Sequence, residues 1–442
     1  MEELALFGGP VSVTAKLSQT GLRPLVSMQA RLDIDRMLQN GEISISPMVG
    51  KFERAFADYI GAKYTLCACN GTTVLQEALF AVGIQPGDEV IVPSYTFWAT
   101  VAPIVAAHGK PVFCDVDEKS YTIDPNCIEK LITPRTKVIM LVHVWGVPCD
   151  MDRILEIARK HNLAVIEDCA HAHGAMYHGK KVGTFGDVAM FSLQGSKVMA
   201  AGEGGVLVTN NRTYYERAVS LGHYERIGSL PPDSEYRQYA LTGLGFKHRM
   251  HPLGAAIAYH DLMELDQRND IRDTNGAMLD AGIADLPFIS QQAVLPDTRR
   301  LYSYHYARYH ADKLMGIKLT TILTALKAEG LTIGVCGYGR LHKAPLFVKG
   351  SPYGDGCPCS KAGVQKGTGC AQVELPVTER LAEETFFMAP RFENKCPELI
   401  QGYIHAYHKI AENAEKLLAY EQAHMDETVI NKNVSGTSIN LF

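Results

Sequence analysis

Three short segments of the chain carry residue types that could do chemistry. The first, residues 70–73, reads Asn-Gly-Thr-Thr between an expected strand and an expected helix. Glycine lets a ligand approach the backbone, and the helix N-terminus and the hydroxyls add donors, so the segment could cradle an anion. An Asn-Gly turn followed by a threonine cap explains the same residues. Taken alone, this segment is an ordinary turn as readily as a binding site.

The second segment is an apolar run that ends in two acids, Glu167 and Asp168. A carboxylate buried at the end of a strand must be paired or hydrogen-bonded, because an isolated buried charge is too costly. Either acid could instead cap the following turn, an explanation that suits Glu167 better than Asp168. We therefore predict that Asp168 is a site residue with a cationic partner.

The third segment, residues 191–197, reads Phe-Ser-Leu-Gln-Gly-Ser-Lys and is followed by Gly-Glu-Gly-Gly at 202–205. Lys197 could be a solvated cation, or it could be an amine that forms a Schiff base. In chain order the three segments offer an anion cradle, an acid for a pyridinium nitrogen and a lysine. These are the parts needed to hold pyridoxal 5'-phosphate.

The elements around these segments predict a layered α/β fold. Between Lys63 and Asn210, short β-branched runs alternate with helical periodicity, which is typical of a mostly parallel sheet covered by helices. We expect strands at 64–69, 89–92, 112–116, 138–144, 163–166 and 206–209, and helices at 73–82, 97–107 and 151–161. Such a sheet binds ligands beyond the carboxyl ends of its strands, where all three segments fall.

After Gly254 the pattern changes, and we expect a second, smaller domain. A long helix is expected at 255–270, an aromatic-rich strand at 301–309, a helix at 321–328 and a final helix at 399–420. The predicted organisation is an N-terminal arm at 1–25, a large cofactor-binding domain at 26–265, a smaller C-terminal α+β domain at 266–425 and a tail at 426–442.

Composition narrows the class of protein. The 442 residues are 46% hydrophobic and 21% charged, near the averages for globular chains. A formal net charge of -5 gives no basic footprint for nucleic acid, and no apolar run approaches the roughly 18 residues of a membrane span. The 11 cysteines are odd in number and scattered, which favours free thiols in a reducing, cytoplasmic compartment.

In its motifs and their order, the chain resembles the DegT/StrS family of sugar and cyclitol aminotransferases, which have the aspartate-aminotransferase-like fold. Within that family it looks nearest to the branch of glutamine:scyllo-inosose aminotransferases. The resemblance spans nearly 400 positions. Its motifs lie at 6–10 (Leu-Phe-Gly-Gly-Pro), 52–57, 86–93, 166–174, 191–205, 247–253 and 325–330.

The resemblance implies roles for single residues. Lys197 would form the Schiff base with pyridoxal phosphate and then move a proton between the two carbons of the imine. Asp168 would pair with the pyridine nitrogen, and Trp98 would stack on the ring, unless it is simply part of a helix-face core. The phosphate would be held by Gly71, Thr72 and Ser192.

Two positions depart from the family pattern. His171 stands where glutamine is common; an imidazole can donate the same hydrogen bond to the phenolic oxygen of the cofactor and can also titrate near neutrality. Lys247 stands where an asparagine often reaches the phosphate in the partner subunit, so it implies a homodimer with shared active sites, unless it only faces solvent. Lys197 itself is retained, whereas related dehydrases carry histidine there, which favours transamination.

The expected activity is therefore transfer of an amino group. L-glutamate or L-glutamine would give the group, pyridoxamine 5'-phosphate would store it, and a keto-sugar or keto-cyclitol would accept it. A pyridoxamine-phosphate-dependent dehydrase or deoxygenase and a non-catalytic, cofactor-binding regulatory protein are the alternatives. Arg340 and Lys343 could meet a diphosphate, so a nucleotide-linked acceptor stays open.

Other polar residues carry weaker signals. His143, Trp145 and Gly146 lie at a strand end, where they could touch substrate or only pack. Cys357, Cys359 and Cys370 do not complete a regular zinc spacing, so no metal is expected.

Overall fold

A seven-stranded sheet forms the centre of the computed structural model, which describes residues 2–14, 26–348 and 373–424. The strand order is β1-β9-β8-β5-β4-β2-β3, and β9 alone runs antiparallel to its neighbours. The strands are β1 (Tyr64–Ala68), β2 (Glu89–Pro93), β3 (Lys110–Cys114), β4 (Thr136–Val142), β5 (Ala164–Asp168), β8 (Val188–Ser192) and β9 (Gly205–Thr209). The mostly parallel α/β sheet predicted from the sequence is confirmed.

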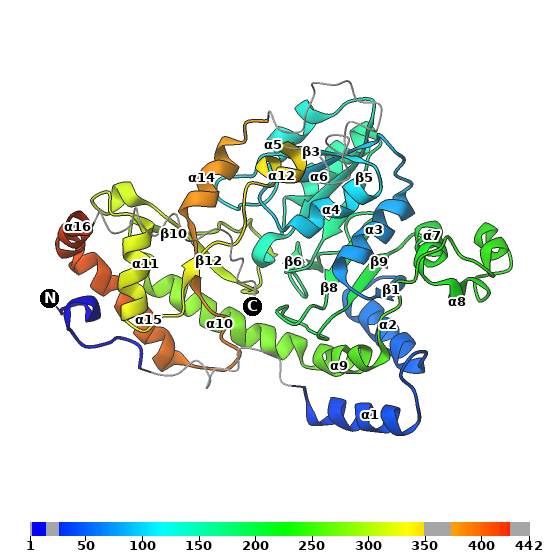
Figure 1. The fold of residues 1–442 in the computed structure, drawn as a ribbon, viewed down its shortest axis with the longest axis horizontal. Coiled ribbons are helices and arrows are strands. Elements are labelled where there is room, and N and C mark those ends of the chain that lie inside the picture. The colour runs from blue at the N-terminus through cyan, green and yellow to red at the C-terminus, as the bar shows by residue number, and fades with distance from the viewer. Residues whose placement is uncertain (1, 15–25, 349–372, 425–442) are drawn as a thin grey trace.

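Helices cover both faces of this sheet (Figure 1). The helices of this part are α1 (Met28–Gln39), α2 (Pro47–Ile60), α3 (Gly71–Val82), α4 (Trp98–Ala106), α5 (Pro125–Ile128), α6 (Met151–His161), α7 (Arg212–Gly222), α8 (Tyr224–Ile227) and α9 (Pro252–Met263). Alternate residues of β4 face the two helical layers: Val138 and Met140 pack with α3, α4 and α7, whereas Ile139 and Leu141 pack with α2, α6 and α9. A small antiparallel sheet joins β6 (Met176–Tyr177), β7 (Lys180–Lys181) and β11 (Thr298–Arg299).

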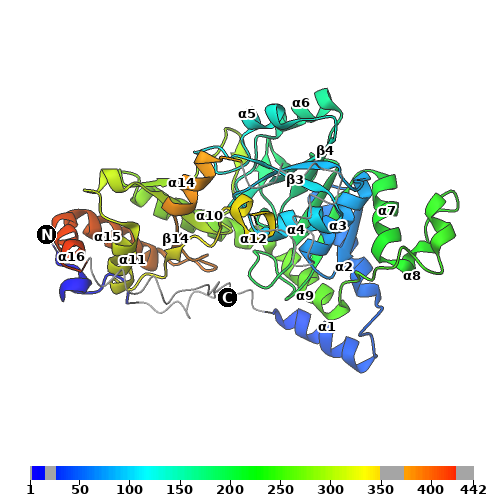
Figure 2. The ribbon, with the colours of Figure 1, turned by 45° about the horizontal axis from the view of Figure 1, so that its top comes forward.

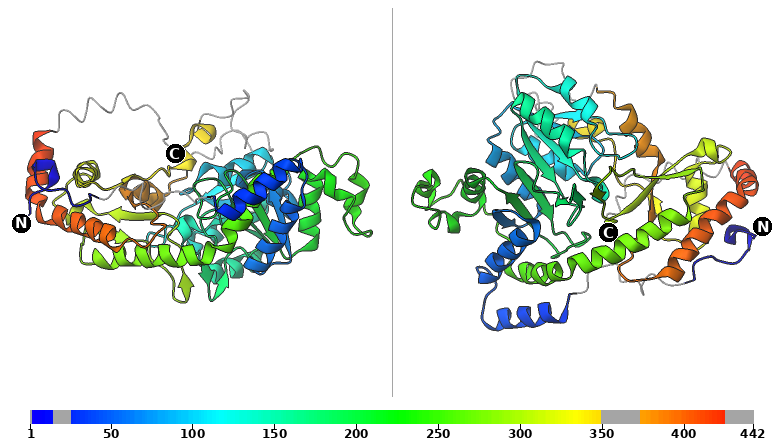
Figure 3. Two further views of the ribbon diagram at one scale, coloured as in Figure 1. Left: turned by 90° about the horizontal axis from the view of Figure 1, so that it is seen from below. Right: turned by 180° about the vertical axis from the view of Figure 1, so that it is seen from behind.

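The C-terminal elements build a second core around a four-stranded antiparallel sheet, β10-β12-β14-β13. Its strands are β10 (Ile289–Gln291), β12 (His305–Tyr309), β13 (Gly334–Val335) and β14 (Thr385–Ala389). The helices are α10 (Leu265–Gly282), α11 (Leu319–Ala328), α12 (Pro345–Val348), α14 (Pro376–Glu384), α15 (Pro397–Glu412) and α16 (Ala414–Ala423). Helix α10 leads from α9 into this second core (Figure 3).

The N-terminal residues belong to this second core. Leu4 and Val13 are buried in it, and the Glu329 carboxylate accepts hydrogen bonds from the Ala5 amide at 2.7 Å and the Ser12 hydroxyl at 2.6 Å. Lys409 completes the cluster with an ion pair to Glu329 at 3.1 Å. The domain boundaries expected at 25, 265 and 425 stay predictions.

Three expected elements are wrong in their bounds. The helix expected at 255–270 is divided between α9 and α10, which meet at Glu264. The helix expected at 399–420 is divided at Asn413, because its side-chain amide donates 2.9 Å hydrogen bonds to the carbonyls of Glu2 and Lys409. The strand expected at 301–309 begins only at His305.

None of the helices in the described ranges has the length and apolar character of a membrane span.

Candidate active site

The predicted site residues gather where parallel strands of the large sheet end. Asp168 is the last residue of β5, Ser192 is the last residue of β8, and Gly71 begins the helix that follows β1. In the sheet, Asp168 lies opposite Met190, so Asp168 and Ser192 are near neighbours at one edge. The strand-end location expected from the sequence therefore brings these three residues together.

A close backbone approach forms the anion cradle at the start of α3. The Asn70 side chain caps the helix by accepting a 2.9 Å hydrogen bond from the Thr73 amide. A Cβ added to Gly71 would lie 2.9 Å from Met190 Sδ and 3.1 Å from Ser192 Cβ, so any larger residue would require these side chains to shift. The helix N-terminus and the Ser192 hydroxyl thus face the same small space, which suits an anion.

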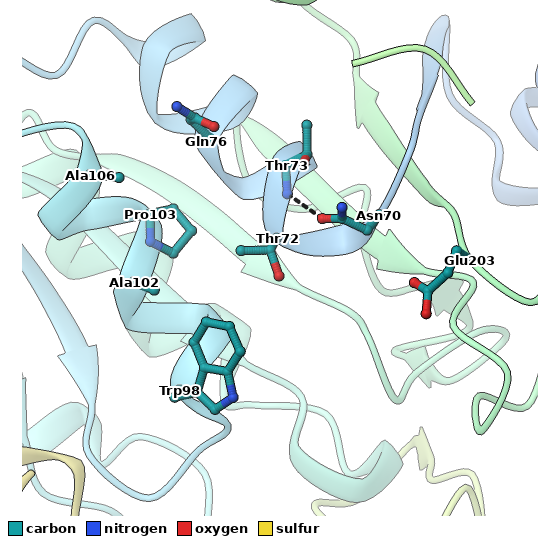
Figure 4. A pocket seen from close by; sticks show the side chains of 9 residues that line it. All are labelled: Asn70, Thr72, Thr73, Gln76, Trp98, Ala102, Pro103, Ala106 and Glu203. Carbon is teal, nitrogen blue, oxygen red and sulfur yellow. Dashed lines mark hydrogen bonds between the residues drawn. The ribbon is translucent and has the colours of Figure 1, made fainter. Parts of the chain in front are cut away.

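A cavity of about 450 Å³ opens beside this cradle, between α3, α4 and the loop that carries Glu203 (Figure 4). Its lining residues are Asn70, Thr72, Thr73, Gln76, Trp98, Ala102, Pro103, Ala106 and Glu203.

Trp98 is 53% exposed, whereas Val101 and Ile104 of the same helix are buried. The alternative that Trp98 belongs to a helix-face core is therefore wrong. Its indole borders the cavity, where a planar ring could stack on it.

Asp168 is a buried acid with few hydrogen-bond donors around its carboxylate. Its Oδ2 accepts a 2.9 Å hydrogen bond from the Thr100 hydroxyl, and its Oδ1 accepts a 3.0 Å bond from the Ala170 amide. Burial raises the pKa of Asp168, and those two donors, with the charge of Lys197, only partly oppose the rise. The side chain is thus suited to a further, cationic partner.

The surroundings of His171 favour its neutral form, whereas titration near neutrality stays a prediction from the sequence. Burial takes its pKa well below the usual value, and the positive charge of Lys197 adds to the effect. Its Nδ1 accepts a 3.2 Å hydrogen bond from the Trp145 amide, so the ring hydrogen sits on Nε2, 3.2 Å from the Tyr338 hydroxyl. His171 can therefore act as a fixed hydrogen-bond donor.

Lys197 lies in the loop that joins β8 to β9. The two arms of the loop are paired, since the Gly195 amide donates to the Gly202 carbonyl at 2.8 Å and the Leu193 amide to Gly204 at 2.9 Å. The Lys197 amine stands over the Tyr304 ring, 5.9 Å from its centroid. Although burial would raise the pKa of Tyr304, the charges of Lys197 and Arg391 and a hydrogen bond with Ser196 together outweigh it, and the pKa is lowered.

Of the predicted site residues, Lys247 is the one that lies apart from the strand-end group of Gly71, Asp168 and Ser192. Its side chain is exposed, and its amine lies over the Tyr224 ring at 5.7 Å. The bridge of Lys247 to His223 and the bond from the Cys69 amide to the His248 carbonyl hold its segment beside β1.

Sequence reasoning missed Thr100 and Tyr304. Thr100 is two residues after Trp98 in α4 and supports Asp168; a hydroxyl one half-turn from a candidate stacking residue was an available signal. Tyr304 directly precedes β12 and carried no local signal, but its ring lies 5.0 Å from that of His171 and beside Lys197.

His143 and Trp145 pack rather than face the cavity. His143 Nε2 is 3.1 Å from Glu167 Oε2, and both side chains are fully buried. Trp145 is buried between stacked tyrosine rings, 4.0 Å from Tyr306 and 5.4 Å from Tyr338.

The buried group His143, Glu167 and Cys169 brings possible metal-ligand atoms within 4.8 Å of one another. The Glu167 oxygens are already engaged by His143 and by backbone amides, which leaves them little capacity for an ion. Cys357, Cys359 and Cys370 lie outside the described residues.

Comparison with known proteins shows the family of the chain. The model of the DegT/DnrJ/EryC1/StrS aminotransferase family matches residues 27–386. The chain is 35% identical over 389 residues to a putative L-glutamine:3-amino-2,3-dideoxy-scyllo-inosose aminotransferase of Streptoalloteichus tenebrarius, covering 86% of this chain and 90% of that protein. It is 44% identical over 230 residues to the GDP-perosamine synthase of Caulobacter vibrioides, covering 52% of this chain and 60% of that one.

Among solved structures, DesV of S. venezuelae in complex with a ketimine intermediate is 30% identical, with a TM-score of 0.71 over 87% of this chain and 94% of that chain. The family match extends over most of the chain and includes every segment singled out at the strand ends of the large sheet. The chain belongs to the DegT/DnrJ/EryC1/StrS aminotransferase family, and it is an aminotransferase.

Proposed function

We propose that this enzyme transfers an amino group from L-glutamine or L-glutamate to a keto-cyclitol, with pyridoxal 5'-phosphate as its cofactor. The observation that carries the proposal is the grouping of Gly71, Asp168, Ser192 and Lys197 at one edge of the sheet. Enzymes of this family use that cofactor, and pyridoxamine 5'-phosphate is its aminated form.

The residues present fit the cofactor. A phosphate matches Gly71 and Thr72 at the N-terminus of α3 with the Ser192 side chain beside them, since a Cβ on Gly71 would lie 3.3 Å from Ser192 Oγ. A pyridinium N–H matches Asp168, whose carboxylate is buried and forms no ion pair within the described part of the chain.

Two further groups would complete the site. The exposed indole of Trp98 offers a face for the ring of the cofactor, and the Nε2–H of His171 would donate to an oxygen on that ring in place of the Tyr338 hydroxyl, which lies 3.2 Å away.

The cofactor, when bound, carries the amino group and takes up electrons in its ring. Within this chain, Asp168 keeps a proton on the ring nitrogen by offering a charged acceptor. The Lys197 Nζ, once free, would take a proton from the substrate carbon that bears nitrogen and pass it to the cofactor carbon on the other side of that nitrogen, and in the opposite half of the reaction it would move a proton the other way. Thr100 holds the Asp168 carboxylate in place.

The direct test is Lys197→Ala. We expect turnover with L-glutamine and scyllo-inosose to fall by at least about a thousandfold, because the amine both binds the cofactor and moves the proton. Lys197→Ala protein that still turns over would refute the proposal. Conversion of the bound cofactor by donor alone separates an aminotransferase from a cofactor-binding regulator or a dehydrase.

Two observations favour a keto-cyclitol over a nucleotide-linked keto-sugar. The relative that covers most of the chain is named for a keto-cyclitol, although GDP-perosamine synthase matches over about half of it. Arg340 and Lys343, the cations considered for a diphosphate, pair with Glu383 at 3.0 Å and Glu379 at 2.6 Å. Parallel assays with scyllo-inosose and a nucleotide-linked keto-sugar decide between the acceptors.

We further propose that Lys247 completes the site of a second copy in a homodimer. Exposed apolar side chains accompany it, including Leu241, which is 96% exposed, and Phe246. Helices α7 and α8, which lead to this segment, extend away from the second core (Figure 2). Burial of such a surface against another subunit is favourable.

Mixing inactive variants tests this shared site. Lys197→Ala and Lys247→Ala proteins, each with low activity, should together recover about a quarter of wild-type activity after subunit exchange, because mixed dimers hold one intact site. No recovery in dimers shown to have exchanged would contradict the proposal.

We also propose a cytoplasmic location, which the free state of all eight cysteines in the described ranges supports.

A further inference from the structure

The backbone on both sides of Lys197 is held by arginines from the second core. Arg391 Nη1 donates a 2.6 Å hydrogen bond to the carbonyl of Ser196, the residue before the lysine. Arg272 Nη2 donates a 3.1 Å bond to the carbonyl of Val198, the residue after it. Two guanidinium groups thus donate hydrogen bonds to the carbonyl groups of the residues before and after Lys197.

One carboxylate joins the two arginines. Glu393 Oε1 accepts a 3.1 Å bond from Arg391 Nε, and Glu393 Oε2 accepts bonds from Arg272 Nε at 2.9 Å and Nη2 at 2.5 Å. All three side chains are nine-tenths buried or more. Burial lowers the pKa of Arg272 to about 10, so it stays charged at neutral pH.

Helix α10 fixes this group in space. Arg272 also donates to the Asn269 side chain at 2.8 Å, and one turn later Asn275 donates to the carbonyls of Phe392 and Asn394 at 3.1 and 2.8 Å. The segment that carries Glu393 is therefore fastened to the same helix as Arg272.

These contacts are of a kind that fixes geometry. Charge-assisted hydrogen bonds in a buried setting are short and strong, and a planar guanidinium holds two partners at set angles. Gripping both neighbours of Lys197 limits rotation of its backbone, so the amine returns to the same place in each turnover. A misplacement of about 1 Å at a reacting group can cost about a hundredfold in rate.

We propose that Arg272, Glu393 and Arg391 form a bracket that positions the amine of Lys197. They are positioning residues, which act through the peptide groups of Ser196 and Val198. The inference rests on the proposed role of Lys197, and it adds that the second core sets the place of a lysine carried by the large sheet.

The test compares Arg391→Lys and Glu393→Gln with Arg308→Lys. Arg308 is a matched control, because it also lies in the second core and bonds two carboxylates, Glu118 and Glu384, away from the lysine loop. Amide hydrogen exchange of residues 194–201 is measured in the purified full-length protein, with and without pyridoxal phosphate. The rate of amino transfer from L-glutamine is measured in the loaded enzyme.

In both bracket variants we expect exchange in 194–201 to rise at least about tenfold, with exchange elsewhere unchanged. We expect the amino-transfer rate to fall about 10- to 100-fold, while KM for L-glutamine changes less than about threefold. Arg308→Lys should leave both at wild-type values. If Arg391→Lys folds poorly, Glu393→Gln still tests the inference.

Wild-type exchange in 194–201 in both bracket variants would overturn the inference. So would a large rise in KM with unchanged exchange, which would make Arg391 a ligand for the donor instead. The exchange measurement does not depend on what Lys197 does, so it can fail independently of the Lys197→Ala result.

Discussion

Two neighbouring acids at the end of β5 meet opposite surroundings. Glu167 and Asp168 are consecutive, so their side chains leave opposite faces of the sheet. Glu167 accepts from His143 and from the amides of three residues, Gly183, Phe185 and Gly186, at 2.6–3.1 Å. Asp168 accepts one bond from Thr100 and one from Ala170.

The pKa values move in opposite directions. Burial alone would raise the pKa of Glu167, but His143 and the backbone amides outweigh it and the pKa is lowered. Burial dominates at Asp168, and the pKa is raised. The hydrogen bonds of Glu167 thus compensate for the burial of its charge. The charge of Asp168 is not fully compensated, and a cationic ligand would stabilise it. Both acids are buried, so burial does not separate them. The opposite directions of their pKa shifts do, and they mark Asp168 as the acid suited to bind a ligand.

Among the variants that test this contrast between the two acids, Asp168→Asn should have the largest effect. Loss of the charge facing a pyridinium nitrogen should weaken pyridoxal phosphate binding by about 10²- to 10³-fold, since a buried charge pair is worth several kcal/mol. Cofactor titration followed by absorbance checks this. Unchanged affinity would remove Asp168 from the site.

Glu167→Gln should act on stability instead. The new amide would face backbone N–H donors, so the free energy of unfolding should fall by about 3 kcal/mol. Because the pKa of Glu167 is lowered in the folded protein, its stabilisation is present above its unfolded value near 4.5 and is lost as pH falls. Denaturant unfolding at pH 7 and pH 4 measures both effects. A Glu167→Gln protein with normal stability but weaker cofactor binding would show that Glu167, like Asp168, acts in cofactor binding, and would contradict the contrast.

Thr100→Val tests the support of Asp168. Removing the 2.9 Å hydrogen bond should raise the pKa of Asp168 further and weaken cofactor binding about tenfold. Thr96→Val is a suitable control, because its hydroxyl meets that of Thr100 at 3.1 Å. Equal losses in the two variants would show that the hydroxyl pair acts through helix α4 rather than through Asp168.

The smallest effect is expected for His171→Gln. Since burial keeps the pKa of His171 well below 6.5, the histidine stays neutral across pH 6–8. The variant should therefore keep the shape of the wild-type pH–rate profile and lose less than about threefold in kcat. Disappearance of a step near pH 6.5 in the variant would show that the histidine titrates after all.

Much of the site could be predicted from the sequence because its signals are local. The β-branched runs predicted the strands, and an acid at the end of an apolar run predicted Asp168. The hydrogen-bond donors around Asp168 could not be predicted, because Thr100 is 68 residues away from Asp168 in the sequence. Nothing local indicates that Tyr304 and Arg391 meet the Lys197 loop, since both lie far from it in the sequence.

The bounds of the helices failed for a related reason. Asn413 ends a helix through a bond to Glu2, a contact between chain segments that no periodicity records. Lys247 carried a family signal, but no local pattern indicates that its exposed side chain lies over the Tyr224 ring.

The most direct test of the central claim is the stability of cofactor-free Asp168→Asn protein against wild type between pH 4 and pH 8. A raised pKa in the folded state means that the contribution of Asp168 to stability is present below its unfolded value of 3.8 and is lost as pH rises through the folded value. We therefore predict that the variant unfolds at a higher denaturant midpoint than wild type at pH 8, by a margin that shrinks toward pH 4. A variant less stable than wild type at every pH would show that Asp168 is already satisfied, as Glu167 is, and would contradict the account.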